Sequence, residues 1–274
     1  MKFSIIIPTK DSARDLANAL NSILVQNFKD YEIIVMDGVS KDGTSKVIKQ
    51  FAKRFDGRLR WISEPDKGVY DAMNKGIGLA KGEWIYFLGS DDVLYSKYVL
   101  ERVNGAISKN DLDVIYGNVR WGNTRRLYDG KFTPLKLMNQ NICHQAIFYK
   151  RDIFKKFGKY NLKYRMWADH ALNMQWFNDK DTKKKYIGLT IAKYGIGGFS
   201  SVNSQDDEFI KDRDKLIEKY FPKEYSGFNQ EIKEKDYIIQ QREKELEEIK
   251  ASVFWKLRSR CYGLRSLFSF KNHS

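Results

Sequence analysis

The chain is poor in cysteine and has no long apolar run. Cys143 and Cys261 are the only two cysteines among 274 residues, too few for a disulfide framework and without the spacing of metal ligands. No run of eighteen apolar residues occurs, so we expect no segment that spans a bilayer. The start, MKFSIIIPTK, has five apolar residues before Pro8, too few for the core of a signal peptide. We therefore expect a cytoplasmic protein.

The charge is strongly basic, but it lacks the pattern of a nucleic-acid-binding protein. Lysine and arginine number 49 against 35 acidic residues, for a net charge of +14. These residues are spread along the chain, with one dense patch in the tail, and they form no nucleic-acid-binding motif. We expect no nucleic-acid partner, and anionic lipid surfaces or phosphorylated substrates suit this charge equally well. A hydrophobic content of 42% excludes a disordered chain.

The first ninety residues alternate between two kinds of segment. Four apolar segments resemble buried strands, at 3–8, 31–37, 58–63 and 83–89. Three segments between them resemble helices, at 12–26, 43–55 and 68–82. This order predicts right-handed crossovers and a parallel sheet covered by helices on both faces. The predicted fold class is α/β, with a Rossmann-like and mostly parallel sheet.

The rest of the chain is less regular. We expect strands at 111–121 and 183–194, a strand and a short helix within 141–158, and a helix at 166–178. Beyond Phe221 and Pro222 the composition becomes highly charged and favours helix. The sequence therefore predicts a domain at 1–220 and a helical tail at 221–274.

Polar residues concentrate where the four early strands end. These strand ends carry Pro8–Thr9, Asp37–Gly38, Glu64–Gly68 and Gly89–Asp92. In open α/β sheets, ligands bind beyond the carboxyl ends of the strands. We therefore expect all four segments to lie on one rim and to form a binding site.

Two adjacent carboxylates, Asp91 and Asp92, interrupt the apolar stretch YFLGSDDVLY. Magnesium and manganese are usually held by one or two carboxylates, with substrate phosphates completing the coordination. Adjacent acids in loops are more often solvated, or they cap a following helix. Their position at the end of the fourth strand favours a cation site.

Five stretches, taken in order and spacing, resemble a family 2 glycosyltransferase of the GT-A fold over about residues 1–200. They are SIIIPTKD, NSILVQNFKDYEIIVMDGVSKDGT, EPDKGVYDAMNKGIGLAKGEWIYFLGSDD, CHQAIFYKRDIF and WADHALNMQ. Such enzymes move a sugar from a nucleotide-sugar donor to an acceptor hydroxyl, with inversion at the anomeric carbon. The resemblance implies that the domain at 1–220 is catalytic.

The resemblance also assigns roles to particular positions. It implies ten donor-contacting residues: Pro8, Thr9, Asp11, Asp37, Asp66, Lys67, Asp71, Asn74, Ser90 and Asp91. Asp92 would ligate Mn²⁺ or Mg²⁺, which offsets the charge of the leaving diphosphate. Asp169 would be the general base that takes the proton of the attacking hydroxyl. Four more residues would contact the acceptor or the donor sugar: His144, Gln145, Trp167 and His170.

The sequence departs from the family's common pattern at two places. The second strand of such enzymes often ends in two acids, but here Asp37 is followed by Gly38. Asp11 lacks the aromatic neighbour that is common beside it. Asp37 would accept a hydrogen bond from the base, as a uracil imide requires. Both departures bear on the preference for a UDP-sugar and leave the metal site unaffected.

Several of these residues also have a purely structural interpretation. Asp37 and the pair Asp66–Lys67 suit turns, and Asp169 suits the first turn of a helix because of the helix dipole. His144 could be a buried, hydrogen-bonded histidine, and His170 could only orient Asp169. The stretch GIGGFSS, residues 195–201, is either a mobile flap over the donor or a plain strand-to-loop junction.

The tail has two patterns. Four apolar residues recur every seven positions, at Ile232, Ile239, Leu246 and Val253, but basic residues occupy complementary heptad positions. Further on, one helical face carries Val253, Leu257, Cys261, Leu264 and Phe268. Four basic residues flank that face, at Lys256, Arg258, Arg260 and Arg265, with no acid between Ser252 and Ser274. This pattern predicts an anchor at an anionic membrane surface; the alternative is packing on the domain or on a second subunit.

We therefore expect a metal-dependent, inverting glycosyltransferase, peripheral at the inner face of the cell membrane. Its acceptor would be a glycan or a lipid-linked saccharide. A sugar nucleotidyltransferase is a rival, but PTKDSARD is not the Gly-rich, basic loop that such an enzyme needs after its first strand. A non-catalytic scaffold is the other rival, and it needs neither Asp92 nor Asp169.

Overall fold

The computed structural model describes residues 1–122, 124, 127–128, 130–195 and 205–251. The chain divides into two compact units, Met1–Phe221 and Pro222–Ser274. In the second unit, the described part is one helix, α10 (Pro222–Ala251). Within the described residues, no helix combines the length and the apolar composition needed to cross a membrane.

The first half of the unit Met1–Phe221, called the catalytic unit below, as the resemblance implies, alternates strand and helix, as the sequence predicts. Its elements are β1 (Phe3–Thr9), α1 (Leu16–Leu24), β2 (Tyr31–Asp37), α2 (Thr44–Arg54), β3 (Leu59–Ser63), α3 (Val69–Leu79) and β4 (Trp84–Phe87). Two helix ends differ from the prediction. α1 begins four residues later than expected, and the Ser12 hydroxyl instead bonds the Lys10 carbonyl and the Ser90 hydroxyl. α3 ends at Leu79 because Ala80 is already extended.

The second half contains shorter and more varied elements. They are β5 (Val93–Leu94), α4 (Val99–Ser108), β6 (Val114–Trp121), β7 (Leu127–Tyr128), α5 (Pro134–Asn139), the 3₁₀ turn η1 (His144–Ala146), β8 (Ile147–Lys150), α6 (Asp152–Lys156), α7 (Ala168–Asn178), β9 (Lys184–Tyr194) and α9 (Asp207–Tyr220). The strands at 111–121 and 183–194 and the helix at 166–178 are confirmed, with small shifts at their ends. The two-residue strands β5 and β7 were not predicted.

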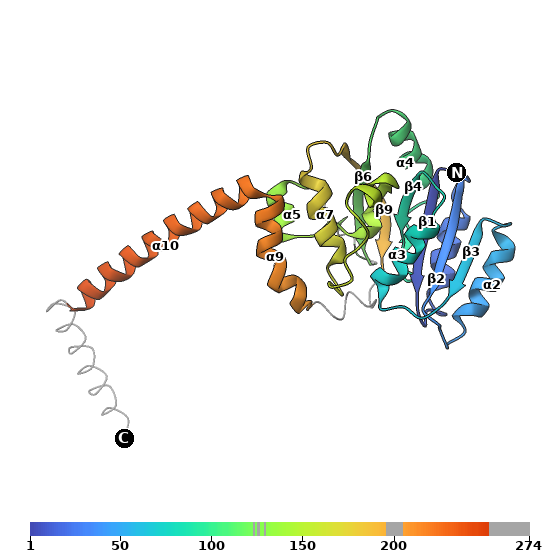
Figure 1. The fold of residues 1–274 in the computed structure, drawn as a ribbon, viewed down its shortest axis with the longest axis horizontal. Coiled ribbons are helices and arrows are strands. Elements are labelled where there is room, and N and C mark those ends of the chain that lie inside the picture. The colour runs from blue at the N-terminus through green and yellow to red at the C-terminus, as the bar shows by residue number, and fades with distance from the viewer. Residues whose placement is uncertain (123, 125–126, 129, 196–204, 252–274) are drawn as a thin grey trace, which may run out of the picture. The chain divides into compact units, whose positions relative to one another are not determined.

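One mixed sheet lies at the centre of the unit Met1–Phe221 (Figure 1). Its strand order is β3-β2-β1-β4-β8-β6-β9-β5, and β7 pairs with β6. The pairs within β3-β2-β1-β4 are parallel, as predicted. β8 runs antiparallel to both β4 and β6, so the parallel character stops at β4 and returns only between β6 and β9. The α/β class is confirmed, and the sheet is more mixed than the sequence predicts.

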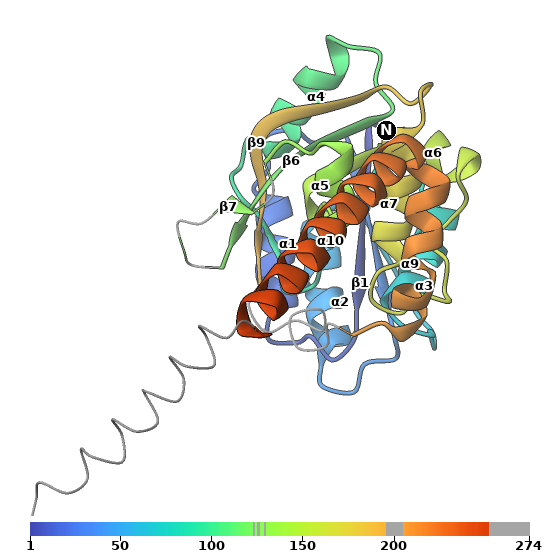
Figure 2. The ribbon, with the colours of Figure 1, turned by 90° about the vertical axis from the view of Figure 1, so that its left-hand side faces the viewer.

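Helices cover both faces of this sheet. On β1, Ile5 and Ile7 belong to a buried cluster that includes apolar residues of α1 and α2. Ile6, between them, faces α3, where a Cβ at Gly76 would lie 2.5 Å from its side chain. Figure 2 shows α1 and α2 on one side of β1 and α3 on the other. Burial of each isoleucine contributes about 1.5–3 kcal/mol to the stability of the fold. Packing on both faces therefore holds the sheet in place, and with it the rim that carries the site.

Candidate active site

A cavity of about 1180 Å³ lies beyond the carboxyl ends of β1 and β4. Its opposite wall comes from η1 and from the segment that leads into α7. Twelve of the sixteen predicted site residues line it: Pro8, Thr9, Asp11, Asp66, Lys67, Ser90, Asp91, Asp92, His144, Gln145, Trp167 and Asp169. The sheet therefore brings segments more than one hundred and fifty residues apart to a single cavity (roughly from residue 8 to residue 169).

Asp92 is the most buried carboxylate of this cavity. It is 2% exposed, and its two oxygens accept hydrogen bonds from the Gln145 side chain (2.9 Å) and the Gly195 backbone N–H (2.8 Å). A Cβ at Gly89 would lie 2.5 Å from the Asp92 carboxylate and 3.0 Å from that of Asp91. Glycine at position 89 therefore leaves room for both acids on the same side of the turn.

Burial and, to a lesser extent, the neighbouring charge of Asp91 raise the pKa of Asp92 to about 6. Two carboxylates held this close suit a cation, because a cation removes their repulsion. No cluster of three or more His, Cys, Asp or Glu side chains that could hold a metal occurs within the described residues. Magnesium and manganese usually need only one or two carboxylates when substrate phosphates supply other ligands. A carboxylate offers about four lone-pair sites, so Asp92 retains sites beyond its two hydrogen bonds, and the pair fits such a cation.

Asp169 lies in the first turn of α7 and lines the same cavity as Asp91 and Asp92. Its Oδ1 accepts hydrogen bonds from the Tyr70 hydroxyl (2.8 Å) and the His170 backbone N–H (2.8 Å). Burial and the charge of Asp169 hold the pKa of Tyr70 well above its usual value, so the hydroxyl remains a donor. The second oxygen, Oδ2, is left as an acceptor at the cavity.

His144 sits beside this second oxygen. Its Nδ1 lies 3.7 Å from Oδ2 of Asp169, and its side chain is 20% exposed. Burial alone lowers the pKa of His144, but the charges of Asp169, Asp92 and Asp91 outweigh it. The net shift of the His144 pKa is upward because three carboxylates lie around its ring.

The segment before α7 is held by a residue that sequence reasoning missed. Asp206 precedes α9 and caps it, because its Oδ1 accepts the N–H of Phe209. Its Oδ2 accepts the N–H groups of Met166 (2.8 Å) and Trp167 (3.2 Å). The Trp167 ring stacks on Phe209 at 6.1 Å between centroids. Asp206 thereby fixes the start of the helix that carries Asp169.

At the other end of the cavity, Thr9 and Asp66 lie near the ends of β1 and β3. Thr9 is 5% exposed, and its hydroxyl makes no hydrogen bond to any described residue. The Asp66 carboxylate occupies the space over Gly38, because a Cβ there would lie 2.5 Å from its Oδ2. Asp66 therefore takes the place next to Asp37 where enzymes of the family that the sequence resembles often carry a second acid.

Two predicted donor contacts on this side do not line the cavity. Asp37 is 2% exposed, and its carboxylate accepts hydrogen bonds from the hydroxyls of Ser40 and Ser63. It holds the loop after β2, which is the structural role that its turn sequence suggested. The Asp71 carboxylate accepts the N–H of Lys67 (3.0 Å) and so shapes the loop before α3. Both residues support the rim from behind.

Asn74 and His170 also lie outside the cavity lining. The Asn74 amide bonds the backbone of Tyr160 twice, at 2.8 and 2.9 Å, and ties α3 to the segment after α6. The His170 ring is 3% exposed, hydrogen-bonds the Leu137 carbonyl (2.7 Å) and packs against Phe209. Only the backbone of His170 contacts Asp169 among the interactions described here. Asn74 and His170 thus have structural partners, and their predicted contacts, Asn74 with the donor and His170 with the acceptor or the donor sugar, stay predictions.

Two sequence predictions fall beyond the described residues. Residues 196–201 of the flap considered at 195–201 are outside them, whereas Gly195 is described and its backbone N–H donates to Asp92. The basic amphipathic segment of the tail lies within 252–274, which is also outside.

Comparison with known proteins identifies the family. The profile of the family described as "Glycosyl transferase family 2" matches residues 4–161. A PGL/p-HBAD biosynthesis glycosyltransferase of Mycobacterium bovis is 41% identical over 211 residues, which cover 76% of this chain and 82% of the relative. Glycosyltransferase AglE of Haloferax volcanii is 28% identical over 169 residues, 57% of this chain and 55% of the relative.

Solved structures share the fold. S. aureus TarS (residues 1–349), in complex with UDP-GlcNAc, superimposes with a TM-score of 0.68 at 19% identity, over 81% of this chain and 68% of that one. Mannosyltransferase PcManGT from Pyrobaculum calidifontis, in complex with GDP-Man and Mn²⁺, gives 0.58 at 15% identity, over 73% and 58%. These structures have the GT-A architecture that the sequence predicted. The chain therefore belongs to glycosyl transferase family 2 and is a glycosyltransferase.

Proposed function

We propose that the enzyme transfers a sugar, with inversion, from a UDP-sugar to a hydroxyl of a glycan or lipid-linked saccharide. The observation that carries this proposal is the position of Asp169, which lines the same cavity of about 1180 Å³ as Asp91 and Asp92. This volume exceeds the range of about 300–1,000 Å³ typical of small-ligand sites, so donor and acceptor fit together. The UDP-GlcNAc bound by TarS and the GDP-Man bound by PcManGT support a nucleotide-sugar donor.

The chemistry follows from the two acidic walls. The bond between the anomeric carbon and the donor phosphate oxygen breaks, and its electron pair leaves with the diphosphate. A divalent cation, Mn²⁺ or Mg²⁺, held by Asp92 would offset that charge. The acceptor oxygen forms the new bond from the opposite face of the sugar, and Oδ2 of Asp169 takes its proton. Attack from that face inverts the configuration.

The nucleobase end of the cavity favours Asp66 over Asp37 as the base-binding acid. Asp66 lines the cavity, whereas both oxygens of Asp37 accept hydrogen bonds from serine hydroxyls. A carboxylate at this place accepts the N–H of a uracil imide. The buried hydroxyl of Thr9, which lacks a partner among the described residues, supplies a further hydrogen-bonding group on the same side.

Nucleotide release from UDP-, GDP- and dTDP-sugars, with Mn²⁺ and with chelator, tests the proposal. We expect release from a UDP-sugar only with the cation. Asp169→Asn should lower kcat about 10²–10⁴-fold, the usual contribution of a general base, and leave donor affinity nearly unchanged. Asp92→Asn should abolish the metal-dependent gain in donor affinity.

Asp152→Asn is the matched control, because Asp152 is an exposed acid in the first turn of another helix. It should keep wild-type kinetics. Loss of donor affinity in Asp169→Asn, or full activity with chelator present, would contradict the assigned roles.

A further inference from the structure

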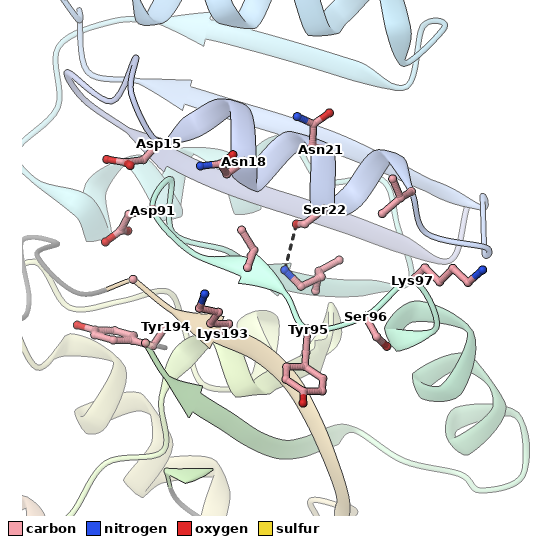
Figure 3. A pocket seen from close by; sticks show the side chains of 15 residues that line it. Asp15, Asn18, Asn21, Ser22, Asp91, Tyr95, Ser96, Lys97, Lys193 and Tyr194 are labelled. Carbon is pink, nitrogen blue, oxygen red and sulfur yellow. Dashed lines mark hydrogen bonds between the residues drawn. The ribbon is translucent and has the colours of Figure 1, made fainter. Parts of the chain in front are cut away.

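A second groove, of about 650 Å³, opens between α1 and the strand pair β5–β9 (Figure 3). Asp15 and Asn18 reach it from α1, and Lys193 and Tyr194 reach it from β9. Four residues line both this groove and the catalytic cavity: Asp15, Asp91, Tyr194 and Gly195. The two spaces therefore adjoin at the acidic turn, and one extended ligand could occupy both.

The walls of the groove are held by buried hydrogen bonds. Gln26, 1% exposed, donates from its side chain to the Ser96 carbonyl (2.7 Å) and accepts the N–H of Leu100 (3.1 Å). The Ser22 hydroxyl accepts the N–H of Leu94 at 3.0 Å, the bond drawn in Figure 3. These bonds join α1 to the β5 segment, so the groove is formed before any ligand binds.

The charges that line the groove balance one another. Asp15 and Asp91 are opposed by Lys97 and Lys193, which leaves no net charge. A site for phosphate or another anion needs an excess of positive charge. A site for an acyl chain needs a mainly apolar lining, and here acids, amides and hydroxyls stand beside Val25 and Val93. Neither kind of ligand suits this surface.

The uncharged side chains offer hydrogen bonds and aromatic faces. Asn18 is exposed and its side-chain amide makes no hydrogen bond to another described residue, so this amide can both donate and accept. Tyr194 is held by stacking on Trp121, with centroids 4.7 Å apart. Tyr95 is 45% exposed, and its hydroxyl accepts a hydrogen bond from Arg120 at 3.3 Å. Such a combination matches a sugar, which presents hydroxyls at its edge and C–H groups on its faces.

We propose that this groove binds a neutral glycan segment of the acceptor, remote from the hydroxyl that reacts. The inference rests on the proposed function, because an acceptor glycan in the catalytic cavity would continue into the groove past Asp91. It adds a subsite on α1 and β9 that would favour an acceptor chain over a single sugar.

The test is binding to an array of neutral oligosaccharides, measured beside nucleotide release without acceptor. Asn18→Trp fills the groove, and Gln50→Trp places the same ring on the exposed surface of α2 as the control. We expect the wild type and Gln50→Trp to bind the same glycans. Asn18→Trp should bind them at least about tenfold more weakly, which is the effect expected from the loss of one good contact.

Nucleotide release separates this inference from the proposed function. Asn18 lines the groove and not the catalytic cavity, so release should continue near the wild-type rate in both variants. No release from any nucleotide-sugar by the wild type would refute the proposed function. Equal glycan binding by Asn18→Trp and the wild type, or no glycan binding by the wild type, would overturn the groove assignment.

Discussion

At the scale of single residues, the two oxygens of Asp169 have different tasks. Oδ1 is bound by Tyr70 and by the His170 backbone, which fixes the carboxylate plane. Oδ2 remains at the cavity, near His144. A base that is held by one oxygen and reacts through the other needs no reorientation when the acceptor arrives. Tyr70 is thus a positioning residue, and its place within GVYDAMNKG was the sequence signal that could have revealed it.

Tyr70→Phe tests this positioning role. The variant loses the bond to Asp169, so we expect kcat to fall about tenfold or more, with little change in the donor KM, because the base no longer keeps its plane. Tyr164→Phe is the control, since its hydroxyl also donates to a carboxylate, Asp212, at 2.8 Å. Both variants should lose about 1–3 kcal/mol of stability, measured by denaturant unfolding. A wild-type kcat in Tyr70→Phe would argue against the role.

The raised pKa of His144 predicts how its contribution to stability depends on pH. Because the folded state binds the proton more tightly, this contribution is complete below the ordinary histidine pKa of about 6.5 and is lost as pH rises through the raised value. The difference in Tm between the wild type and His144→Gln should therefore shrink from acid to alkaline pH.

His170→Gln is the control for this pH series. Burial lowers the pKa of His170, so its contribution is complete at alkaline pH and is lost as pH falls through the lowered value. The Tm difference for His170→Gln should therefore shrink in the opposite direction. If the Tm difference changed with pH in the same direction for both variants, the pKa of His144 would not be raised as described.

At the scale of elements, local sequence was sufficient for the strands and the rim. The apolar runs that end in Pro8–Thr9 and Gly89–Asp92 predicted two of the parallel strands, β1 and β4. They also predicted the edge of the sheet at which the cavity lies. The helix ends were less predictable. Serine is a residue type that commonly caps the start of a helix. The Ser12 hydroxyl instead bonds that of Ser90, seventy-eight positions away in the sequence, and α1 starts only at Leu16. Such a contact exists only after the sheet has formed.

Roles that depend on distant segments could not be predicted in this way. The insertion of β8 between β4 and β6 reverses one strand, and strand order has no local signature in the sequence. Asn74 had the spacing of a site residue relative to Asp71, but its partner is the backbone of Tyr160. No sequence pattern predicted a role for Asp206, and only the fold reveals that it caps α9 and also holds Trp167. Residue type and spacing identify polar groups that need partners, whereas topology selects the partners.

At the scale of the whole molecule, charge distinguishes the end of the tail from the rest of the chain. The charged residues of the catalytic unit include many acid–base pairs, such as Lys163 with Asp212. The stretch between Ser252 and Ser274 has basic residues and no acid. Basic residues near an anionic membrane contribute about 1 kcal/mol each. We therefore propose that this stretch holds the enzyme at the inner face of the cell membrane, where a lipid-linked acceptor would be found.

Charge reversal in the full chain tests that proposal. We expect the wild type to pellet with vesicles of anionic lipid at low salt and to be released as salt rises, because screening weakens the attraction. A variant with glutamate at Lys256, Arg258, Arg260 and Arg265 should stay in the supernatant. The control carries glutamate at four exposed lysines of the catalytic unit, Lys41, Lys46, Lys49 and Lys53, and has the same change in net charge. Equal pelleting of both variants would mean that net charge, and not the tail, directs the protein to the vesicles.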